Sequence, residues 1–374
     1  HICKKNIYIE AFSCKYAFFY VTLQAKTIIH IIMKRKIAII AGGDSSEYGV
    51  SLRSAAGIYS FLDKEKYAIT VVKLRGCEWH ALAETDGEID KHNGAVPEES
   101  EKWVSIDKND FSYTYDGKKT SFDFAYITIH GTPGENGVLQ GYLDMVGVPY
   151  SCCGVLAAAM TFNKYTCNHY LKGFGVKVAE SVLLRKAKGE RLEVKGEDIV
   201  AQLGLPCFIK TNVGGSSFGV TKVKTLEEVE PAVEKAFAEG EEVICEAFME
   251  GVEITCGVYK TKNKAVAFPI TEVVTSNEFF DYDAKYNGQV DEITPARIPD
   301  EVRDAVQAIT LKIYDILGCK GIIRVDYILT GDGAIKREAK GDWQINLLEV
   351  NTTPGMTATS FIPQQVRAAG LDIK

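Results

Sequence analysis

Short apolar runs that end in turns, with helical patterns between several of them, constrain this chain more than any other feature. The first run ends at Gly42-Gly43, which predicts a buried parallel strand and its turn. After two strands and a helix, a polar, turn-rich stretch extends to residue 123. This alternation predicts an α/β fold with a parallel sheet. The predicted elements are strands at 35–41, 68–74 and 124–129, a helix at 48–62 and a helix from about residue 138.

The rest of the chain divides into two further blocks with short connections and without an internal repeat. In the second block we expect helices at 163–173 and 226–238 and strands at 181–184, 207–210 and 242–247. In the last block we expect strands at 253–259, 265–274, 321–329 and 344–350, a loop at 275–297 and a helix at 300–317. The predicted domains are therefore 33–150, 151–248 and 249–374, packed around a shared cleft.

Composition excludes several classes of function. Of 374 residues, 46% are hydrophobic and 25% are charged, as in soluble globular proteins. Lys and Arg number 43 and Asp and Glu number 50, so the net charge of −7 argues against nucleic-acid binding. The 10 cysteines form no C-x-x-C pair, so we expect reduced thiols in a cytoplasmic protein rather than a zinc site.

Residues 1–32 are treated separately, because their composition differs from that of the segment that follows. Charged residues such as Glu10 and Lys15 interrupt every apolar run well before the roughly 18 residues that a membrane span needs. The same two residues interrupt the apolar region expected of a signal peptide. We therefore expect a native start at Met33, a non-native leader at 1–32 and no membrane association.

A glycine- and serine-rich loop follows the strand predicted at 207–210. Its glycines allow backbone amides to approach an anion, Ser216 and Ser217 add hydroxyl donors, and Lys210 adds a positive charge. The Gly-Lys-Ser/Thr of a Walker A loop is absent. On the residues alone, a phosphate-binding loop and an ordinary hairpin loop remain equal alternatives.

Two strands near the C-terminus carry polar side chains at alternating positions. Arg324 and Asp326 share one face of the first strand, and Glu349 and Asn351 share one face of the second. If the strands pair across the turn at 330–343, three oxygen-bearing side chains meet, as Mg²⁺ prefers. The alternative is a solvated polar face, but both motifs end otherwise apolar strands, which favours metal.

Loops at the ends of parallel strands are a third candidate site. Residues 130–137 leave one strand and enter a helix, and 42–47 do the same after the first strand. A dinucleotide-binding fold is disfavoured, because the first loop lacks G-x-G-x-x-G and the second strand ends without an acid for a ribose. Glu246 ends another apolar strand, where it could bond a ligand, and Glu253 follows; such acids are more often surface residues.

Taken in order, these motifs closely resemble the D-alanine–D-alanine ligase family of the ATP-grasp superfamily, from about residue 35 to the end. The resemblance implies an N-terminal Rossmann-like substrate-binding domain followed by two ATP-grasp subdomains. The motifs are Gly42-Gly-Asp-Ser-Ser-Glu47, His130-Gly-Thr-Pro-Gly-Glu-Asn-Gly-Val-Leu-Gln-Gly141, Lys210 with Gly-Gly-Ser-Ser217, Phe280-Asp-Tyr-Asp-Ala-Lys-Tyr286, Arg324-Val-Asp326 and Leu348-Glu-Val-Asn-Thr-Thr-Pro-Gly-Met356.

The resemblance also implies a role for each matching residue. ATP would be bound by Lys164, Lys210, Ser216, Ser217, Glu246, Glu253 and Lys285, and two Mg²⁺ (or Mn²⁺) by Asp326, Glu349 and Asn351. Glu47 and His130 would bind the first D-alanine, and Ser360 and Phe361 the carboxylate of the second. Arg324 and the Gly355 amide would form an oxyanion site, and Ser216, Tyr286 and Glu47 a hydrogen-bond network.

The activity implied is ATP-dependent ligation of two D-alanines through an acyl phosphate, for peptidoglycan synthesis, by a cytoplasmic homodimer. The alternatives are a ligase that takes D-lactate or D-serine second, another ATP-grasp carboxylate–amine ligase, and a nucleotide-binding module without catalysis. Tyr286 resembles the dipeptide-forming subgroup, and the metal residues Asp326, Glu349 and Asn351 are all present, which disfavours the non-catalytic module.

Overall fold

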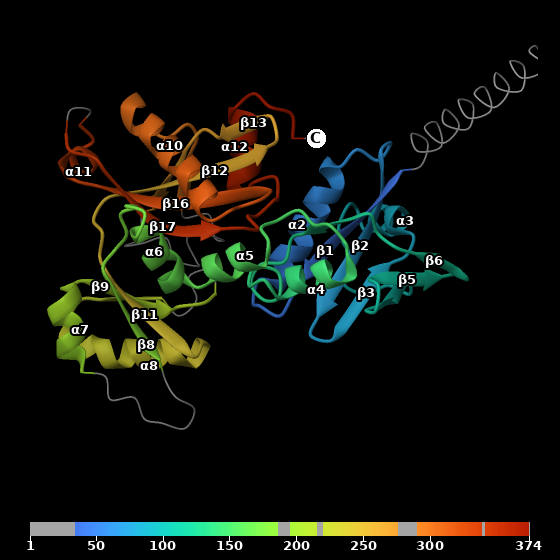
Figure 1. The fold of residues 1–374 in the computed structure, drawn as a ribbon, viewed down its shortest axis with the longest axis horizontal. Helices are drawn as coiled ribbons and strands as arrows, with labels where there is room; N and C mark the ends of the chain where they lie inside the picture. Colours follow the sequence, from blue (N-terminus) through green and yellow to red (C-terminus); the bar gives the residue numbers. More distant parts are fainter. Residues whose placement is uncertain (1–33, 186–194, 215–219, 276–289, 339–340, 374) are drawn as a thin grey trace, which may run out of the picture.

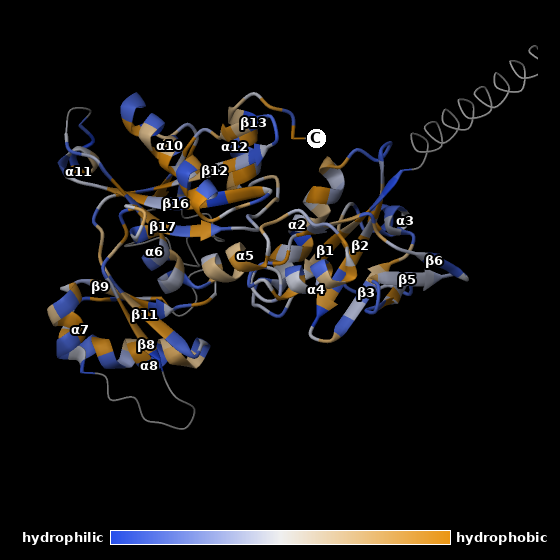
Figure 2. Ribbon diagram, in the orientation of Figure 1, coloured by the Kyte–Doolittle hydropathy of each residue, from blue (hydrophilic) through white to orange (hydrophobic). Residues whose placement is uncertain are grey.

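The computed structural model describes residues 34–185, 195–214, 220–275, 290–338 and 341–373, which form three sheets with their helices (Figure 1). The N-terminal sheet has seven strands, the central sheet four and the C-terminal sheet six. Hydrophobic residues concentrate on the strands and on the helix faces that cover them (Figure 2). The predicted α/β class is therefore confirmed. The leader predicted at 1–32 lies outside the described residues.

The parallel part of the N-terminal sheet agrees with the sequence prediction. Strand β1 (Arg35–Gly42) lies between β2 (Tyr67–Arg75) and β7 (Phe124–Ile127) and is parallel to both. Its central residues are fully buried, because sheet neighbours and helices enclose both faces. Helix α2 (Tyr48–Phe61) follows β1, and α4 (Val138–Val146) follows β7. The carboxyl ends of β1 and β7 therefore deliver two loops to one edge of the sheet.

The stretch predicted to be polar and turn-rich before residue 123 folds instead into an antiparallel extension of this sheet. A two-residue hairpin turn, Asp116-Gly117, has both φ angles positive (47° and 70°), as a type I′ turn requires. The prediction was wrong because these strands are short and pair with partners that the local pattern does not reveal. The elements are β3 (Glu78–Leu82), α3 (Thr85–Lys91), β4 (Trp103–Asp107), β5 (Ser112–Tyr115) and β6 (Lys118–Thr120).

The central sheet is antiparallel and has the strand order β10-β9-β11-β8. Helices cover one of its faces, and aliphatic side chains from both layers form a separate core cluster. Three of its four strands lie where predicted, and the short β10 was not predicted. The elements are β8 (Ser181–Arg185), α7 (Gly196–Leu203), β9 (Cys207–Thr211), β10 (Thr221–Val223), η1 (Leu226–Glu228), α8 (Val229–Glu239) and β11 (Glu242–Ala247).

The C-terminal sheet has the order β15-β14-β12-β16-β17, with β13 also paired to β12. The strand predicted at 265–274 is two strands, because Pro269 lies between them and has no amide hydrogen to donate. The elements are β12 (Val252–Thr261), β13 (Lys264–Ala267), β14 (Thr271–Thr275), β15 (Val290–Ile293), α10 (Asp300–Ile316), β16 (Ile322–Thr330), α11 (Asp332–Lys336), β17 (Gln344–Asn351) and α12 (Phe361–Ala368).

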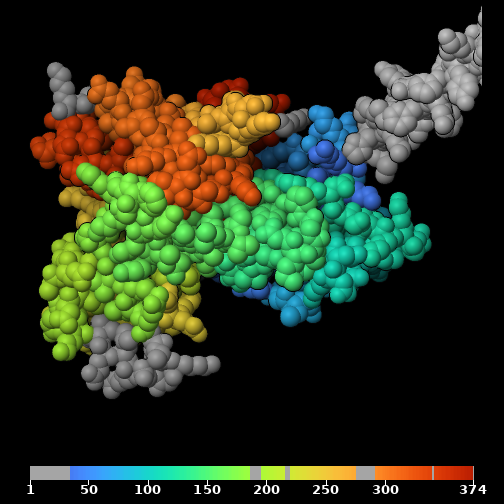
Figure 3. Space-filling model, viewed as in Figure 1, coloured from blue at the N-terminus to red at the C-terminus, as the bar shows by residue number. Residues whose placement is uncertain are grey.

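Helices α5 (Val155–Phe162) and α6 (Lys164–Lys172) connect the N-terminal sheet to the other two. In the space-filling view, the green segment that contains α4, α5 and α6 forms a continuous band between these parts (Figure 3). Ser151 donates its backbone N–H to Ala125 at 3.0 Å beside β7, and Leu347 of β17 donates to Lys177 at 2.8 Å. One continuous segment therefore touches both outer sheets.

The N-terminal and C-terminal parts also touch directly. A Cβ at Gly57 of α2 would lie 2.5 Å from the carbonyl oxygen of Met356, so only glycine allows this approach. Met356, Ile362 and Val366 share a buried apolar cluster with β1 and α2. This packing holds the start of α2 near the loop that precedes α12. None of the described helices is long and apolar enough to cross a membrane.

A buried acid ties together three parts of the C-terminal sheet. The side chain of Glu272 on β14 is 0% exposed and binds Arg297 at 2.8 Å and Arg337 at 2.7 Å. Burial alone would raise the pKa of Glu272, but the hydrogen bonds from Arg297 and Arg337 outweigh it and lower the pKa to about 2. The carboxylate therefore stays charged and links β14 to the segment after β15 and to α11.

We expect this link to lose strength in acid. Because the pKa of Glu272 is lower in the folded chain, its contribution is complete above the unfolded pKa of about 4.5 and declines as pH falls towards 2. Between pH 6 and pH 3.5 the stability difference between the parent and a Glu272→Gln variant should shrink by about 1 kcal/mol. Denaturant unfolding at the two pH values measures this difference. The exposed change Glu234→Gln should show no such dependence, and an unchanged difference for Glu272→Gln would contradict the assignment.

Candidate functional site

A cleft of about 290 Å³ lies between the three parts of the chain. The loops after β1 and β7 supply one wall, the β16–β17 strands supply another, and the segment before α12 closes an end. Several predicted site residues line it together, namely Glu47, His130, Lys164, Arg324, Glu349, Asn351, Gly355, Ser360 and Phe361. Residues from separate sequence motifs therefore meet at one cleft.

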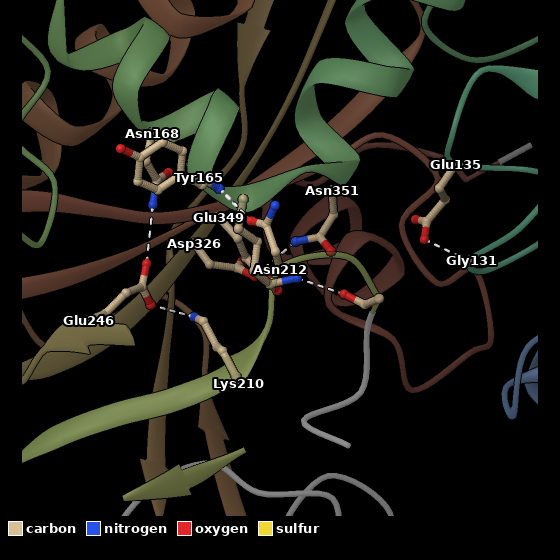
Figure 4. Close-up of polar contacts among 12 residues, drawn as sticks. Gly131, Glu135, Tyr165, Asn168, Lys210, Asn212, Glu246, Asp326, Glu349 and Asn351 are labelled. Carbon is tan, nitrogen blue, oxygen red and sulfur yellow. Dashed lines mark hydrogen bonds and ion pairs between the residues drawn. The ribbon is translucent and has the colours of Figure 1, made fainter. Parts of the chain in front are cut away.

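The predicted pairing of the two polar strands is confirmed. In the antiparallel register of β16 and β17, Arg324 lies opposite Asn351 and Asp326 lies opposite Glu349. Arg324 donates from Nε to Oδ1 of Asp326 at 2.9 Å and from Nη2 to Oδ2 at 2.8 Å. Asn351 Nδ2 donates to Oδ2 of Asp326 at 3.0 Å (Figure 4). Two carboxylates, an amide and a guanidinium thus share one patch.

The Arg324 side chain is 16% exposed and lies beside the acids that balance its charge. Burial alone would lower the pKa of Arg324, but the charge and hydrogen bonds of Asp326 outweigh that effect and raise it. The guanidinium carbon also lies 5.2 Å from the ring centre of Phe361. The Arg324 guanidinium therefore stays positively charged in the cleft. Asp326 and the Phe361 ring hold its orientation from two sides.

Lys164, the first residue of α6, joins the central and C-terminal parts at the cleft. Its Nζ donates to the carbonyl oxygen of Gly214 at 2.6 Å and lies 3.6 Å from Oε2 of Glu349. Asn163 caps the helix, because its side-chain oxygen accepts the amide of Thr166 at 2.9 Å. The helix start thus holds the lysine beside the acid-bearing strand β17.

Lys210 and Glu246 form a buried pair on the neighbouring strands β9 and β11. Their charged atoms are 2.6 Å apart, and the two side chains are 12% and 6% exposed (Figure 4). Asn168 Nδ2 donates to the same carboxylate at 3.4 Å. Burial would lower the pKa of Lys210, but the charges of Glu246, Glu349 and Glu253 raise it. Lys210, Glu246 and Glu253 therefore lie in one electrostatic neighbourhood, although they do not line the cleft itself.

The wall opposite β16 and β17 carries His130 with a second acid, Glu135. His130 is buried, and its Nε2 lies 3.4 Å from the hydroxyl of Ser54 on α2. Glu135 accepts the Gly131 amide at 2.8 Å and the Thr353 hydroxyl at 2.7 Å. Burial raises the pKa of Glu135, and the charge of nearby Glu47 acts in the same direction. This wall therefore gathers two acids and an imidazole.

The end of the cleft before α12 has a tight turn. Ser360 precedes the helix, and its Oγ accepts the Thr357 amide at 3.1 Å. A Cβ at Gly355 would lie 2.9 Å from that oxygen, so a larger residue would displace the serine. The free amides at the start of α12 and the Ser360 hydroxyl favour an anion there.

Some cleft residues were not given a role from sequence. Glu135 lies in the motif that starts at His130, and its position five residues after the histidine was an available signal. Arg53, Glu292 and Thr353 also line the cleft and belong to three different segments, which no local pattern connects. In contrast, the predicted residues Ser216, Ser217, Lys285 and Tyr286 lie outside the described residues.

The β16–β17 patch is chemically suited to a hard divalent cation. Its donors are the Asp326 and Glu349 carboxylates and the Asn351 amide oxygen, which are all oxygen ligands. Within the described part of the chain, no three His, Cys, Asp or Glu side chains cluster closely enough to enclose a metal alone. A cation here would therefore need further oxygens from water or phosphate, as Mg²⁺ commonly has.

Comparison with known proteins gives a consistent result across the chain. A family model described as D-ala D-ala ligase N-terminus matches residues 36–153, and one described as D-ala D-ala ligase C-terminus matches 170–374. D-alanine–D-alanine ligase of Bacteroides fragilis is 63% identical over 91% of this chain and 97% of its own length. The enzyme of that name from Porphyromonas gingivalis is 52% identical over 91% and 96%.

Solved structures agree with this result. A D-Ala:D-Ser ligase from Enterococcus faecalis superposes with a TM-score of 0.77 at 30% identity, covering 91% of this chain and 96% of its own. A D-alanine–D-alanine ligase from Bacillus anthracis, solved in complex with ATP, gives 0.65 at 28% identity, covering 91% and 93%.

The buried Lys210–Glu246 pair gives a testable stability prediction. Lys210→Met should destabilise the chain by about 3–5 kcal/mol, because it leaves a buried carboxylate without a counter-charge. The double variant Lys210→Met/Glu246→Gln should recover most of that loss. Urea unfolding of the parent, both single variants and the double variant measures the coupling. Lys66→Met, in an exposed pair, should change nothing measurable; equal effects at both sites would refute the prediction.

Proposed function

Because the chain belongs to the D-alanine–D-alanine ligase family, we propose that its cleft is the active site and that the residues gathered there have the roles inferred from sequence. The enzyme uses ATP to join two D-alanines into D-alanyl-D-alanine for peptidoglycan synthesis, with formation of ADP (EC 6.3.2.4). The observation that carries the assignment of the site is the approach of the Glu47–His130 wall to the Arg324–Glu349 patch across one cleft.

The ATP-binding part of the proposed site spans the central and C-terminal sheets. Lys164 and Lys210 bind the nucleotide phosphates. Ser216, Ser217 and Lys285 are the other residues to which we assign phosphate binding. Glu246 contacts the adenine and Glu253 the ribose. The buried Lys210–Glu246 pair supports this, because it places a phosphate-binding cation beside an acid that can accept hydrogen bonds from a base.

We also propose that Asp326, Glu349 and Asn351 hold two Mg²⁺, with Mn²⁺ as the alternative metal. Bound there, the ions would neutralise phosphate charge and polarise the transferred phosphoryl group. The all-oxygen donor set on two paired strands supports this assignment. Arg324 keeps the Asp326 carboxylate fixed and ionised beside that position.

The first D-alanine lies between Glu47 and His130, with its carboxylate directed towards ATP. A carboxylate is a poor electrophile, so transfer of the γ-phosphoryl group makes an acyl phosphate. The amine of the second D-alanine, deprotonated before attack, adds to the acyl carbon, and phosphate then leaves. Ser360 and the Phe361 amide hold the carboxylate of this second substrate at the start of α12, where the helix end favours an anion.

Charge develops on the acyl oxygen when the amine adds. Arg324 and the Gly355 amide lie in the same cleft and are the donors that we assign to this oxyanion. Ser216, Tyr286 and Glu47 complete a hydrogen-bond network over the reacting groups. We propose the same domain division as the sequence predicts, 33–150, 151–248 and 249–374, with the first domain binding substrate and the other two enclosing ATP.

We place the enzyme in the cytoplasm, where ATP is available, and the free thiols of the eight described cysteines fit a reducing compartment.

We also propose a homodimer. Val138 and Met145 on α4 and Leu156 on α5 are 61%, 87% and 74% exposed, and these helices touch where Gly137 and Gly141 meet Val155. Such side chains suit a subunit contact.

Removing the acids of the β16–β17 patch should abolish turnover. Asp326→Asn and Glu349→Gln should each lower the D-alanine-dependent release of ADP and phosphate by about 100-fold or more, because phosphoryl transfer relies on charge neutralisation. A coupled ADP assay with D-alanine, L-alanine, D-serine and D-lactate measures activity and substrate choice. The exposed variant Asp332→Asn should retain activity. Full activity of both patch variants, or equal use of L-alanine, would refute the proposal.

The molecular mass of the protein in solution tests the proposed homodimer. Light scattering after size exclusion should give about twice the 41.2 kDa of one chain, and a Met145→Glu/Leu156→Glu variant should shift towards the monomer. Ile335→Glu, which changes an exposed apolar residue on α11, is the matched control and should leave the mass unchanged. A parent that is monomeric at micromolar concentration would refute the dimer.

A further inference from the structure

An acid without an assigned role lies at the end of the cleft proposed for the second D-alanine. Glu292 belongs to β15, the edge strand of the C-terminal sheet, and lines the cleft with Arg324, Ser360 and Phe361. Gln364, in the first turns of α12, holds its carboxylate, because its Nε2 donates to Oε2 of Glu292. The same Nε2 donates to the Thr359 carbonyl at 2.6 Å. The carboxylate is thus anchored to the helix that begins at Ser360.

The pairing of β15 with β14 determines which face Glu292 occupies. Glu292 lies opposite Val273, whereas Ile293 lies opposite Glu272. Since side chains alternate along a strand, Asp291 lies on the face of the Glu272–Arg297 cluster and Glu292 on the cleft face. Two adjacent acids of equal charge therefore face different surroundings, which provides a matched control.

Three other acids at the cleft already have partners. Asp326 accepts hydrogen bonds from Arg324 and Asn351 on its two oxygens. Both oxygens of Glu135 accept hydrogen bonds, and Glu349 lies near Lys164. For Glu292, Gln364 binds Oε2, and among the described residues none bonds or pairs with Oε1. Glu292 therefore keeps one oxygen available on the cleft face.

We propose that Glu292 binds the ammonium group of the second D-alanine and makes this subsite selective for an amino acid over a 2-hydroxy acid. This inference rests on the proposed function. A zwitterion needs opposite charges a few ångströms apart, and the start of α12 with Ser360 supplies the site for its carboxylate. Glu292, held by Gln364 from the same helix, supplies the negative charge. D-Lactate has the same carboxylate but a neutral hydroxyl, so it gains nothing from Glu292.

The surrounding charges are consistent with this role. Partial burial at the cleft wall raises the pKa of Glu292 by desolvation, while the hydrogen bond from Gln364 and the charge of Arg324 act against that rise. Arg324 is itself balanced by its bidentate contact with Asp326, so its positive charge is not free to repel an incoming ammonium. The ammonium therefore meets the carboxylate of Glu292 at this end of the cleft.

The test compares Glu292→Gln with Asp291→Asn. Glu292→Gln preserves shape and can still accept the Gln364 hydrogen bond, but removes the charge. With saturating ATP and D-alanine in the first subsite, we expect it to raise the KM for the second D-alanine about fivefold with kcat little changed, as for one partly exposed ion pair. The preference for D-alanine over D-lactate, measured by mass spectrometry of the two products, should fall by a similar factor. Asp291→Asn should match the parent in both measurements.

A purely structural role would impair both nucleophiles equally, so an unchanged preference in Glu292→Gln would overturn the inference. Glu292→Asp keeps the charge and should retain most of the parent preference; a preference as low as that of Glu292→Gln would also overturn it. The KM for ATP should stay constant in all three variants. A parent without D-alanine-dependent ADP release would instead refute the proposed function, and the inference with it.

Discussion

The antiparallel register of β16 and β17 is the constraint on which the rest of the site depends. It places Arg324 opposite Asn351 and Asp326 opposite Glu349, so that four polar side chains share one face. A shift by one residue would turn all of them to the opposite face and bury them against α10. The apolar residues between them, Val325 and Val350, belong to the largest core cluster and resist such a shift. The packing of the sheet therefore fixes the position of the charged patch.

The same register requires that the other walls be brought to it from distant parts of the chain. The glycine at position 57 lets α2 approach Met356, and α5 and α6 span the distance from the N-terminal sheet to β17. Each wall supplies a different chemistry: an imidazole and acids from the N-terminal loops, a lysine from α6, and a helix start from α12. The cleft is thus a product of packing between sheets rather than of any single sheet.

The sequence predicts which polar side chains share a face better than it predicts helix α5 and the short strands β3 to β6. Arg324, Asp326, Glu349 and Asn351 could be placed on one face because strand side chains alternate with a period of two, whatever the partner. By contrast, α5 is apolar nearly all round and shows no helical period, and β3 to β6 depend on pairing between short segments.

The candidate site shows the same difference. Glu47 and His130 belong to recognisable motifs, whereas the place of Glu292 beside Gln364 depends on the approach of an edge strand to a helix 72 positions away in the chain. Such a contact has no local sequence signature. Single acids of this kind are therefore found from the structure, even where the family and its main motifs are evident from sequence.

The pairing of charges before substrate arrives explains how the proposed reaction can use buried cations without destabilising the fold. Lys164 lies near Glu349, Lys210 binds Glu246 and Arg324 binds Asp326, so each cation has an acid beside it. An unpaired buried lysine or arginine would cost several kcal/mol. In the proposed mechanism, phosphate oxygens become new partners of the lysines, while cations that accompany the nucleotide become new partners of the acids. Because the phosphates and their cations bind together, the net charge of the cleft changes little. Each charged side chain has a partner of opposite charge both before and after the substrates bind, so its desolvation is compensated in both states.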